Sequence, residues 1–458
     1  MSVSEPRPQA AVHGRWADRL VWAAIVVCAL LFAGLAYYRV RSGDLNEVNA
    51  EQVHALSGAS AKPVETGGTD WPQWRGPNRN GVSPETDLLS TWPEDGLKVQ
   101  WSQPTGDGYA GVAIAGGRAV TMVQAGEDEA VVCWDAASGN ELWRFKYAAH
   151  FRHHQFGDGP RSTPAIAGEH VCTVGGTGVM HCLKLASGDK VWRKDLLDEF
   201  GAPVLEWGIA FSPLVEKGLV YVMPGGPRGN AFAALDGSSG SIVWKNLDDA
   251  GSYSSAVAAD LAGRRQIVAL FAERLVGVAP ETGTLLWEFP WPAGPAHTPS
   301  SIVTPLVIHR TSGDYVFISS GYDKGCALVK IEADGARCRA TQVYRNLNMR
   351  SVFSSPVCVG DFVYGFDDVN LTCIDVRNGK RKWKEFGFDK GSLTAADGRL
   401  IVLGAEGTLA LVAAEPDAYH ELGRFQHSDK LCWTAPSVAA GRLYVRNRRQ
   451  VVCYGLKK

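Results

Sequence analysis

The sequence has 458 residues, and its 46 Lys and Arg nearly balance its 48 Asp and Glu, for a formal net charge of −2. With no basic block, this balance argues against a nucleic-acid-binding protein. So long a chain exceeds one ordinary compact core unless that core is built from repeats. Its 51 Gly and 15 Trp are typical of short strands joined by tight turns.

The first element is an uncharged run at residues 20–38, LVWAAIVVCALLFAGLAYY. At a helical rise of 1.5 Å per residue it spans about 28 Å, close to the roughly 30 Å hydrocarbon core of a bilayer. It therefore predicts a transmembrane anchor, with cleavage as a signal peptide at Gly34-Leu35-Ala36 as the alternative. The basic residues of the segment 1–19 place it in the cytoplasm. We expect a single-pass inner-membrane protein whose remainder lies in the periplasm or another extracytoplasmic space.

Two connecting segments follow the apolar run. Residues 39–69 are polar and small and contain Gly-Gly near their end, which predicts a flexible linker. Residues 70–97 begin with DWPQWRGPNRNGVS, and we expect them to form an N-terminal extension that packs on the domain at 98–458.

A repeat organises the rest of the chain. A Gly four residues before a Trp occurs in DAASGNELW (135–143), KLASGDKVW (184–192), DGSSGSIVW (236–244), APETGTLLW (279–287) and DVRNGKRKW (375–383). Before each repeat, or between repeats, a small residue and Pro lead into an apolar strand, a Gly turn and a Val/Tyr-rich strand. Weaker copies start near Gly111, Ser255 and Leu393, which gives eight units. Tyr344 and Phe425 replace the Trp in two of them.

Each unit is typical of four short antiparallel strands, and such sheets bury their faces only by stacking on neighbours in a closed ring. The sequence therefore predicts an all-β fold, an eight-bladed β-propeller preceded by the transmembrane helix. The last unit lacks a fourth strand, and LKVQWSQP (97–104) is expected to supply it. We interpret the repeated tryptophans as structural residues between blades: Trp101, Trp143, Trp192, Trp244, Trp287 and Trp383.

These motifs resemble the pyrroloquinoline-quinone (PQQ)-like repeat family, whose units carry a D-x3-G-x3-W signature. The resemblance covers residues 98–458. The stretches DWPQWRGPNRNGVS (70–83), GPRSTP (159–164) and EWGIAFSPLV (206–215) resemble a subgroup common in planctomycete-type bacteria. The family includes quinone-dependent alcohol dehydrogenases and the non-catalytic outer-membrane protein assembly factor BamB, so the resemblance implies the fold more strongly than an activity.

Family dehydrogenases have a vicinal Cys-Cys pair, a calcium site, a catalytic Asp and often a haem-attaching C-x-x-C-H. This sequence has no adjacent cysteines and no C-x-x-C-H. We therefore expect a non-enzymatic scaffold or protein-binding module that resembles BamB, monomeric, with envelope or membrane proteins as partners. No catalytic residue and no cofactor are predicted, and PQQ is implied by the resemblance alone. A PQQ-dependent dehydrogenase-like oxidoreductase, a ligand sensor and a carbohydrate-binding protein are the alternatives.

Segments just before each inner strand of a propeller converge over the central channel. They predict a funnel with aromatic and arginine side chains, suited to a planar or anionic ligand or to a peptide. The alternative is that these side chains plug the channel and satisfy one another. The residues are Tyr109, Arg161, Glu206, Trp207, Tyr253, Arg350 and Trp433, with His297 in the segment of the fifth blade.

No metal site is predicted. His153 and His154 in FRHHQFGDGPRSTP (151–164) have no partner at a chelating interval, and the sequence has no C-x2-C pair. Cys133, Cys182 and Cys373 each lie six residues before a repeat Gly, which indicates one equivalent core position in three blades. Cys172 faces Cys182 across a predicted hairpin. The sequence does not decide whether the two form a disulfide, because an oxidising compartment would favour the bond and cross-strand geometry would strain it.

Overall fold

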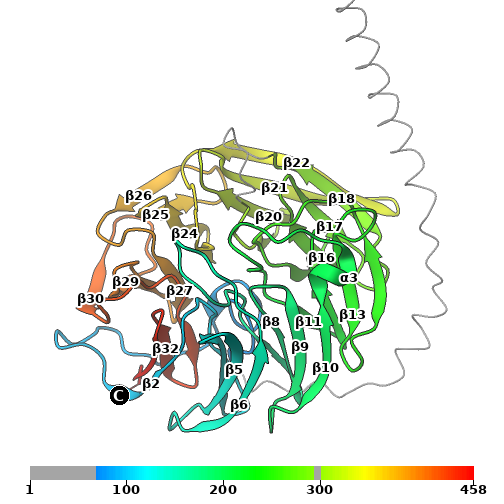
Figure 1. Cartoon of the computed structure of the whole chain (residues 1–458). Coiled ribbons are helices and arrows are strands. Elements are labelled where there is room, and N and C mark those ends of the chain that lie inside the picture. The colour runs from blue at the N-terminus through cyan, green and yellow to red at the C-terminus, as the bar shows by residue number, and fades with distance from the viewer. Residues whose placement is uncertain (1–68, 293–300, 458) are drawn as a thin grey trace, which may run out of the picture. The chain divides into compact units, whose positions relative to one another are not determined.

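In the computed structural model, which describes residues 69–292 and 301–457, eight antiparallel sheets form a ring (Figure 1). The innermost strands follow one another around the ring and close it between the last blade and the first. The predicted eight-bladed β-propeller is thus confirmed. The predicted cytoplasmic segment 1–19 and anchor 20–38 lie outside the described residues, as does the linker up to residue 68. Within the described ranges, no helix is long and apolar enough to cross a membrane.

The strands of each blade are given from the inner to the outer one. Blade 1 consists of β3 (Ala113–Ala115), β4 (Arg118–Ala125), β5 (Asp128–Asp135) and β6 (Glu141–Ala148), and blade 2 of β7 (Ala165–Ala167), β8 (His170–Val174), β9 (Val179–Lys184) and β10 (Lys190–Asp195). Blade 3 consists of β11 (Leu214–Glu216), β12 (Leu219–Val222), β13 (Phe232–Asp236) and β14 (Ile242–Asn246), and blade 4 of β15 (Val257–Leu261), β16 (Arg264–Leu270), β17 (Arg274–Val278) and β18 (Leu285–Pro290). A short helix, α3 (Leu196–Phe200), follows β10.

Blade 5 consists of β19 (Leu306–Arg310), β20 (Gly313–Ser320), β21 (Gly325–Asp334) and β22 (Arg337–Asn346), and blade 6 of β23 (Val357–Val359), β24 (Phe362–Asp367), β25 (Asn370–Asp375) and β26 (Arg381–Glu385). Blade 7 consists of β27 (Ser392–Ala396), β28 (Arg399–Leu403), β29 (Thr408–Ala413) and β30 (Glu421–Gln426), and blade 8 of β31 (Ser437–Ala439), β32 (Arg442–Arg446), β33 (Gln450–Gly455) and β2 (Val99–Pro104). The outer strand of blade 8 therefore comes from the start of the domain, as the sequence predicts.

The repeated Trp and Gly residues belong to the same interface between blades. The indole N–H of Trp143 donates a 2.9 Å hydrogen bond to the Leu185 carbonyl of blade 2, and a Cβ added to Gly188 would lie 2.6 Å from the Trp143 ring. Equivalent bonds to the next blade start from Trp101, Trp192, Trp244 and Trp383. The repeated Gly therefore has two roles. It forms a turn of its own blade, with a positive φ of 76° in blade 2, and its missing side chain leaves room for the Trp ring of the preceding blade.

One tryptophan departs from this plan. The indole N–H of Trp287 donates to Gln266 Oε1 within its own blade, at 2.6 Å. Blade 5 offers no Gly to receive the ring: its strands β21 and β22 are ten residues long, and a Cβ added to Gly335 in the turn between them would meet nothing within 4 Å. Tyr344 and Phe425 do take the Trp position, since the added Cβ of Gly379 and of Gly96 would contact their rings.

The small residues that precede the inner strands connect neighbouring blades. The hydroxyl of Thr163 accepts a 3.0 Å hydrogen bond from the backbone N–H of Gly111. In the same way the hydroxyl of Ser212 accepts from the Thr163 N–H and that of Ser255 from the Ser212 N–H, both at 2.9 Å. Ser355 does the same for Thr304 of blade 5. The Ser/Thr residues near the repeated Pro therefore join the entries to neighbouring inner strands at four of the eight blade junctions.

The N-terminal extension occupies the channel. Trp71 pairs with Ile114 of blade 1, and β1 (Val82–Ser83) joins β27 of blade 7 in parallel. Between them Arg75 donates to the carbonyls of Ser355 and Pro356, and Arg79 donates to those of Ser212 and Pro213. The extension thus bonds directly to inner strands on opposite sides of the ring.

Eight of the nine described cysteines are buried, and Cys133, Cys182 and Cys373 are 0% exposed, as predicted for a core position. Cys133 and Cys373 lie opposite the blade tryptophans Trp143 and Trp383 across their hairpins, so a small side chain faces a large one. Cys172 lies directly opposite Cys182, and both are free thiols. The interaction with Cys182, followed by burial, raises the pKa of Cys172 well above its ordinary value.

Candidate functional site

A cavity of about 150 Å³ lies over the channel, where the connections that precede the inner strands converge. Seven of its lining side chains are aromatic, and most of the remainder are small or apolar. Its walls are Trp74, Tyr109, Phe156, Arg161, Trp207, Ala210, Ser212, Tyr253, Ser255, Ile302, Phe353, Trp433 and Thr434, which we call the funnel pocket.

The structure brings together five of the seven funnel residues named from the sequence: Tyr109, Arg161, Trp207, Tyr253 and Trp433. They come from the connections into blades 1, 2, 3, 4 and 8, so segments separated by more than 300 residues in the chain form one wall. Their convergence follows from the propeller topology, because every connection from an outer strand to the next inner strand crosses the same face.

Two predicted funnel residues do not line the pocket. Glu206 is exposed beside Trp207. Arg350 is drawn away by Asp367, whose Oδ1 accepts a 2.7 Å bond from Arg350 Nε. An ion pair with a buried carboxylate fixes this arginine more strongly than an aromatic wall does. His297 lies in 293–300, outside the described residues.

Eight lining residues are absent from the sequence-based set, and the four with large apolar or aromatic side chains are Trp74, Phe156, Ile302 and Phe353. Phe353 lies three residues after Arg350 in the same connection, and its side chain lines the pocket where that of Arg350 does not. Phe156 and Ile302 belong to the connections into blades 2 and 5. Trp74 comes from the extension, and its indole N–H donates to Thr304 Oγ1 at 2.8 Å.

The aromatic rings of the pocket contact one another around its wall. The centroid of Trp433 lies 4.8 Å from that of Phe353, 5.5 Å from that of Tyr109 and 5.9 Å from that of Phe156. On the other side, Trp207 lies 4.9 Å from Tyr253. These tilted contacts hold the rings in place, so the wall is apolar and preorganised.

Arg161 is the one charged residue of the wall. Its guanidinium donates to the carbonyls of Gly157, at 2.7 Å, and Gly159, and its Cζ lies 4.6 Å from the Phe151 ring centroid and 5.5 Å from that of Tyr109. Burial lowers its pKa to about 10, so it is charged at neutral pH. No carboxylate of the described ranges forms an ion pair with it, so it offers a positive charge to the pocket.

The histidines near Arg161 shape its loop. His150 contacts Asp158 at 3.0 Å, and His153 Nδ1 accepts the backbone N–H of Phe156 at 3.0 Å. His153 also stacks on Phe156, which lines the pocket. Throughout the described part of the chain, no three His, Cys, Asp or Glu side chains are grouped to hold a metal ion. The loop therefore carries Phe156 and Arg161 to the funnel pocket.

Beside this loop, a buried polar cluster joins blades 1 and 2. Glu129, fully buried, accepts from Tyr147 Oη at 2.6 Å and from the Gly176 N–H at 2.9 Å. The His181 ring lies 4.4 Å from that of Tyr147, and its Nδ1 has no partner among the described residues. Burial, aided by Arg193 and Lys190, lowers the pKa of His181 to about 4.

This low pKa predicts a loss of stability in mild acid. An unfolded histidine titrates near 6.5, so between pH 6.5 and 4 the unfolded state binds the extra proton and stability falls as the pH falls. Urea denaturation at pH 7 and pH 5 should show this slope. The His181→Gln variant should reduce it by up to about 1.4 kcal/mol per pH unit. An unchanged slope in the variant would assign the acid sensitivity to other groups.

Comparisons with known proteins agree with this architecture. A family model described as outer membrane protein assembly factor BamB matches residues 127–385, more than half of the chain. The chain belongs to the PQQ-like repeat propeller family. None of the curated proteins matches the sequence. The likeness to a planctomycete-type subgroup stays a prediction.

Solved structures place this PQQ-like propeller beside proteins of different kinds. BamB from Moraxella catarrhalis superposes with a TM-score of 0.54 at 16% identity, covering 79% of this chain and 98% of BamB. Quinohemoprotein alcohol dehydrogenase from Comamonas testosteroni gives 0.58 at 14% identity, with 90% and 83% covered. The computationally designed Ika8 gives 0.53 at 12%, with 81% and 100% covered. At these identities the likeness shows the fold alone.

Proposed function

We propose that the protein is a membrane-anchored, extracytoplasmic scaffold that binds envelope proteins, and that the funnel pocket receives an aromatic or apolar side chain of the partner. The observation that carries the proposal is the aromatic wall of the pocket, with its single unpaired cation. Binding sites of proteins typically combine an apolar cavity with a few polar groups that orient the ligand. The family match to BamB, named as an assembly factor, supports a binding role.

The size of the pocket suits one ring. A volume of about 150 Å³ is comparable to that of an engineered apolar cavity that accepts benzene. Burying an aromatic side chain of roughly 150–250 Å² contributes about 4–6 kcal/mol at 25 cal/mol per Å². Such a buried aromatic residue is the usual anchor of a protein interface. Arg161 is placed to hydrogen-bond a carbonyl or carboxylate next to that anchor.

The proposed location rests on the sequence. The uncharged run at 20–38 and the polar linker at 39–69 suit a single-pass anchor that holds the propeller on the extracytoplasmic side of the inner membrane.

The alternative is a quinone-dependent oxidoreductase or a ligand sensor. The aromatic walls and Arg161 would suit a planar, carboxylated ring. The residues needed for redox chemistry do not fit, because no cysteine or carboxylate lines the funnel pocket. We therefore derive no reaction at this site, and a sensor remains the stronger form of the alternative.

The experiment uses the full chain in its own membrane. A photo-crosslinking phenylalanine derivative at the exposed position Glu206, beside Trp207 on the rim, should capture an envelope protein that the same group at Leu142 of β6 does not capture. Trp433→Ala should weaken that captured complex by tenfold or more, whereas Val204→Ala, at a 61% exposed position, should not.

Two outcomes contradict the scaffold. The first is crosslinking that is equal at both positions or unaffected by Trp433→Ala. The second is a stoichiometric absorbance shift on titrating the purified chain with PQQ, followed by dye reduction when an alcohol is added.

A further inference from the structure

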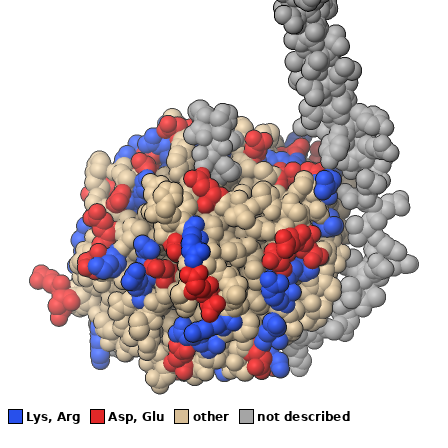
Figure 2. Space-filling model, viewed as in Figure 1, with Lys and Arg blue, Asp and Glu red and all other residues tan. Residues whose placement is uncertain are grey.

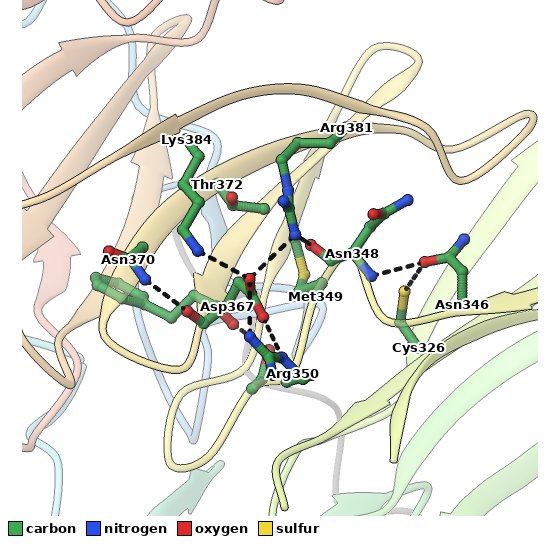
Figure 3. A network of polar contacts seen from close by, with 12 residues as sticks. Cys326, Asn346, Asn348, Met349, Arg350, Asp367, Asn370, Thr372, Arg381 and Lys384 are labelled. Atoms are coloured by element: carbon green, nitrogen blue, oxygen red, sulfur yellow. Dashed lines mark hydrogen bonds and ion pairs between the residues drawn. The ribbon is translucent and has the colours of Figure 1, made fainter. Parts of the chain in front are cut away.

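A second site lies on blade 6, around the buried carboxylate of Asp367 at the end of β24 (Figure 3). Asp367 is 1% exposed and accepts from three cations: Arg350 Nε at 2.7 Å, Arg381 Nη2 at 3.0 Å and Lys384 Nζ at 3.2 Å. Arg350 comes from the connection before β23, whereas Arg381 and Lys384 belong to β26. Figure 3 shows the three side chains converging on the carboxylate from different directions.

The charges in this cluster do not balance. Burial, which raises the pKa of Asp367, is outweighed by the hydrogen bonds and charges of Arg350 and Lys384, so its pKa is lowered and it stays ionised. One further acid, Asp323, approaches Arg350 at 3.3 Å, but it is 79% exposed and its effect is largely screened. A rigid excess of positive charge remains on the surface.

The cations keep donors for a ligand. The side chains of Arg350, Arg381 and Lys384 are 32%, 34% and 26% exposed. Lys384 uses one of its three N–H donors on Asp367. Arg381 uses only Nη2, which bonds Asp367 and the Asn348 carbonyl, and its Nε and Nη1 have no partner among the described residues. Asp367 thus orients the cations without saturating them.

Two large apolar side chains flank these cations. Phe386 directly follows β26, is 68% exposed and lies with its ring centroid 6.0 Å from Lys384 Nζ. Leu347 is 55% exposed and precedes Asn348, whose carbonyl Arg381 holds. We call these five residues, Leu347, Arg350, Arg381, Lys384 and Phe386, the basic-apolar surface. Its combination of cations and exposed apolar groups distinguishes it from an ordinary solvated ion pair.

The local sequence extends the positive charge. Residues 377–390 contain six Lys and Arg but only Glu385 and Asp389 as acids, in a chain whose net charge is −2. On the face in Figure 2, basic and acidic groups are interspersed. Blade 6 therefore carries a local excess of basic residues in its outer strand and the residues around it.

We propose that the basic-apolar surface binds an acidic peptide segment of a partner protein, in which Asp or Glu residues alternate with apolar ones. The carboxylates would take the free donors of Arg381 and Lys384, and the apolar side chains would cover Phe386 and Leu347. Charge complementarity selects an acidic partner, and the exposed apolar side chains favour a peptide over a nucleic-acid duplex, whose exposed backbone offers no apolar contact.

The test measures peptide affinity directly. Fluorescence anisotropy of a labelled Glu/Leu alternating peptide is followed with the full chain in detergent micelles, against empty micelles as blank. We expect at least tenfold tighter binding than for a Gln/Leu or a Glu/Ser peptide, and weakening as salt is added. The double variant R381Q/K384Q should lose tenfold or more. R377Q is the matched control, since Arg377 lies on the same blade, is 60% exposed and pairs with Asp375.

A second variant controls for the possibility that the double variant R381Q/K384Q misfolds. Phe386→Ser leaves the Asp367 contacts in place and should lower affinity several-fold with an unchanged melting temperature. The proposal is overturned if the Gln/Leu peptide binds equally well, if R377Q weakens binding as much as the double variant, or if a DNA duplex competes more tightly at the same salt. Trp433→Ala should leave this affinity unchanged, so the outcome is independent of the funnel pocket.

Discussion

Replacing Trp143 with alanine is expected to lower the free energy of unfolding by about 3–5 kcal/mol, as loss of a large buried aromatic side chain does. The ring fills the space between blades 1 and 2, is 9% exposed and donates to the Leu185 carbonyl. Its removal leaves a cavity that β-strands on both sides cannot close, and the carbonyl loses its partner. Chemical denaturation followed by intrinsic fluorescence and circular dichroism measures the change.

The preceding residue provides the control for this variant. Leu142 lies on the same strand but is 48% exposed, so Leu142→Ala should change the stability by less than about 0.5 kcal/mol. Gly188→Ala tests the interface from the other blade. Its new Cβ would lie 2.6 Å from the Trp143 ring at a φ of 76°, and it should also destabilise. Equal effects of Trp143→Ala and Leu142→Ala would contradict the structural role of the repeat.

The second large effect is expected at the extension in the channel. Arg79 is 2% exposed, and its guanidinium donates to Gln73 Oε1 and to the carbonyls of Ser212 and Pro213, each at 3.0 Å. Arg79→Met keeps the apolar volume but leaves these acceptors unpaired, which costs about 2–4 kcal/mol. Burial, with the nearby charge of Arg75, lowers the pKa of Arg79 to about 9, which still leaves it charged at neutral pH.

Hydrogen exchange by mass spectrometry distinguishes loss of the extension from general destabilisation. In Arg79→Met, exchange should rise first within residues 70–83 and at the inner edge of blade 3, and protease should cut the extension sooner. Arg339→Met, at a 63% exposed arginine, is the control and should change neither. Protection of residues 70–83 that equals the wild type would show that the extension is held without Arg79.

Much of the fold could be predicted from the sequence because the blades repeat one chemistry. The Gly and Trp recur because the Gly of each blade leaves room for the Trp ring of the preceding blade. Counting the strands of the eight units also showed that the last blade needs a fourth strand from the start of the domain. What could not be predicted was the path of the extension. Its partners, such as the carbonyls of Ser212 and Pro356, are backbone atoms that no side-chain pattern reveals.

The candidate site was predictable to the extent that topology alone decides it. The connections converge whatever their residues, so five funnel residues were found from position. Arg350 turns away from the pocket to Asp367, and the sequence could not reveal this pair because Asp367 lies on β24 and meets Arg350 only in the folded blade. Trp74 was missed because it reaches the pocket through the channel and has no place in the repeat.

The pairing of β2 with β33 has a consequence for how the protein comes into being. Val99 of β2 lies opposite Tyr454 of β33. The first strand of the eight blades to be synthesised can therefore pair only after the last one has been made. The entropy of closing so long a loop makes this pairing slow and late. Since the extension directly precedes β2 in the chain, closing the ring also fixes the end of the extension beside blade 8. Ring closure therefore waits until β33 is available to pair with β2.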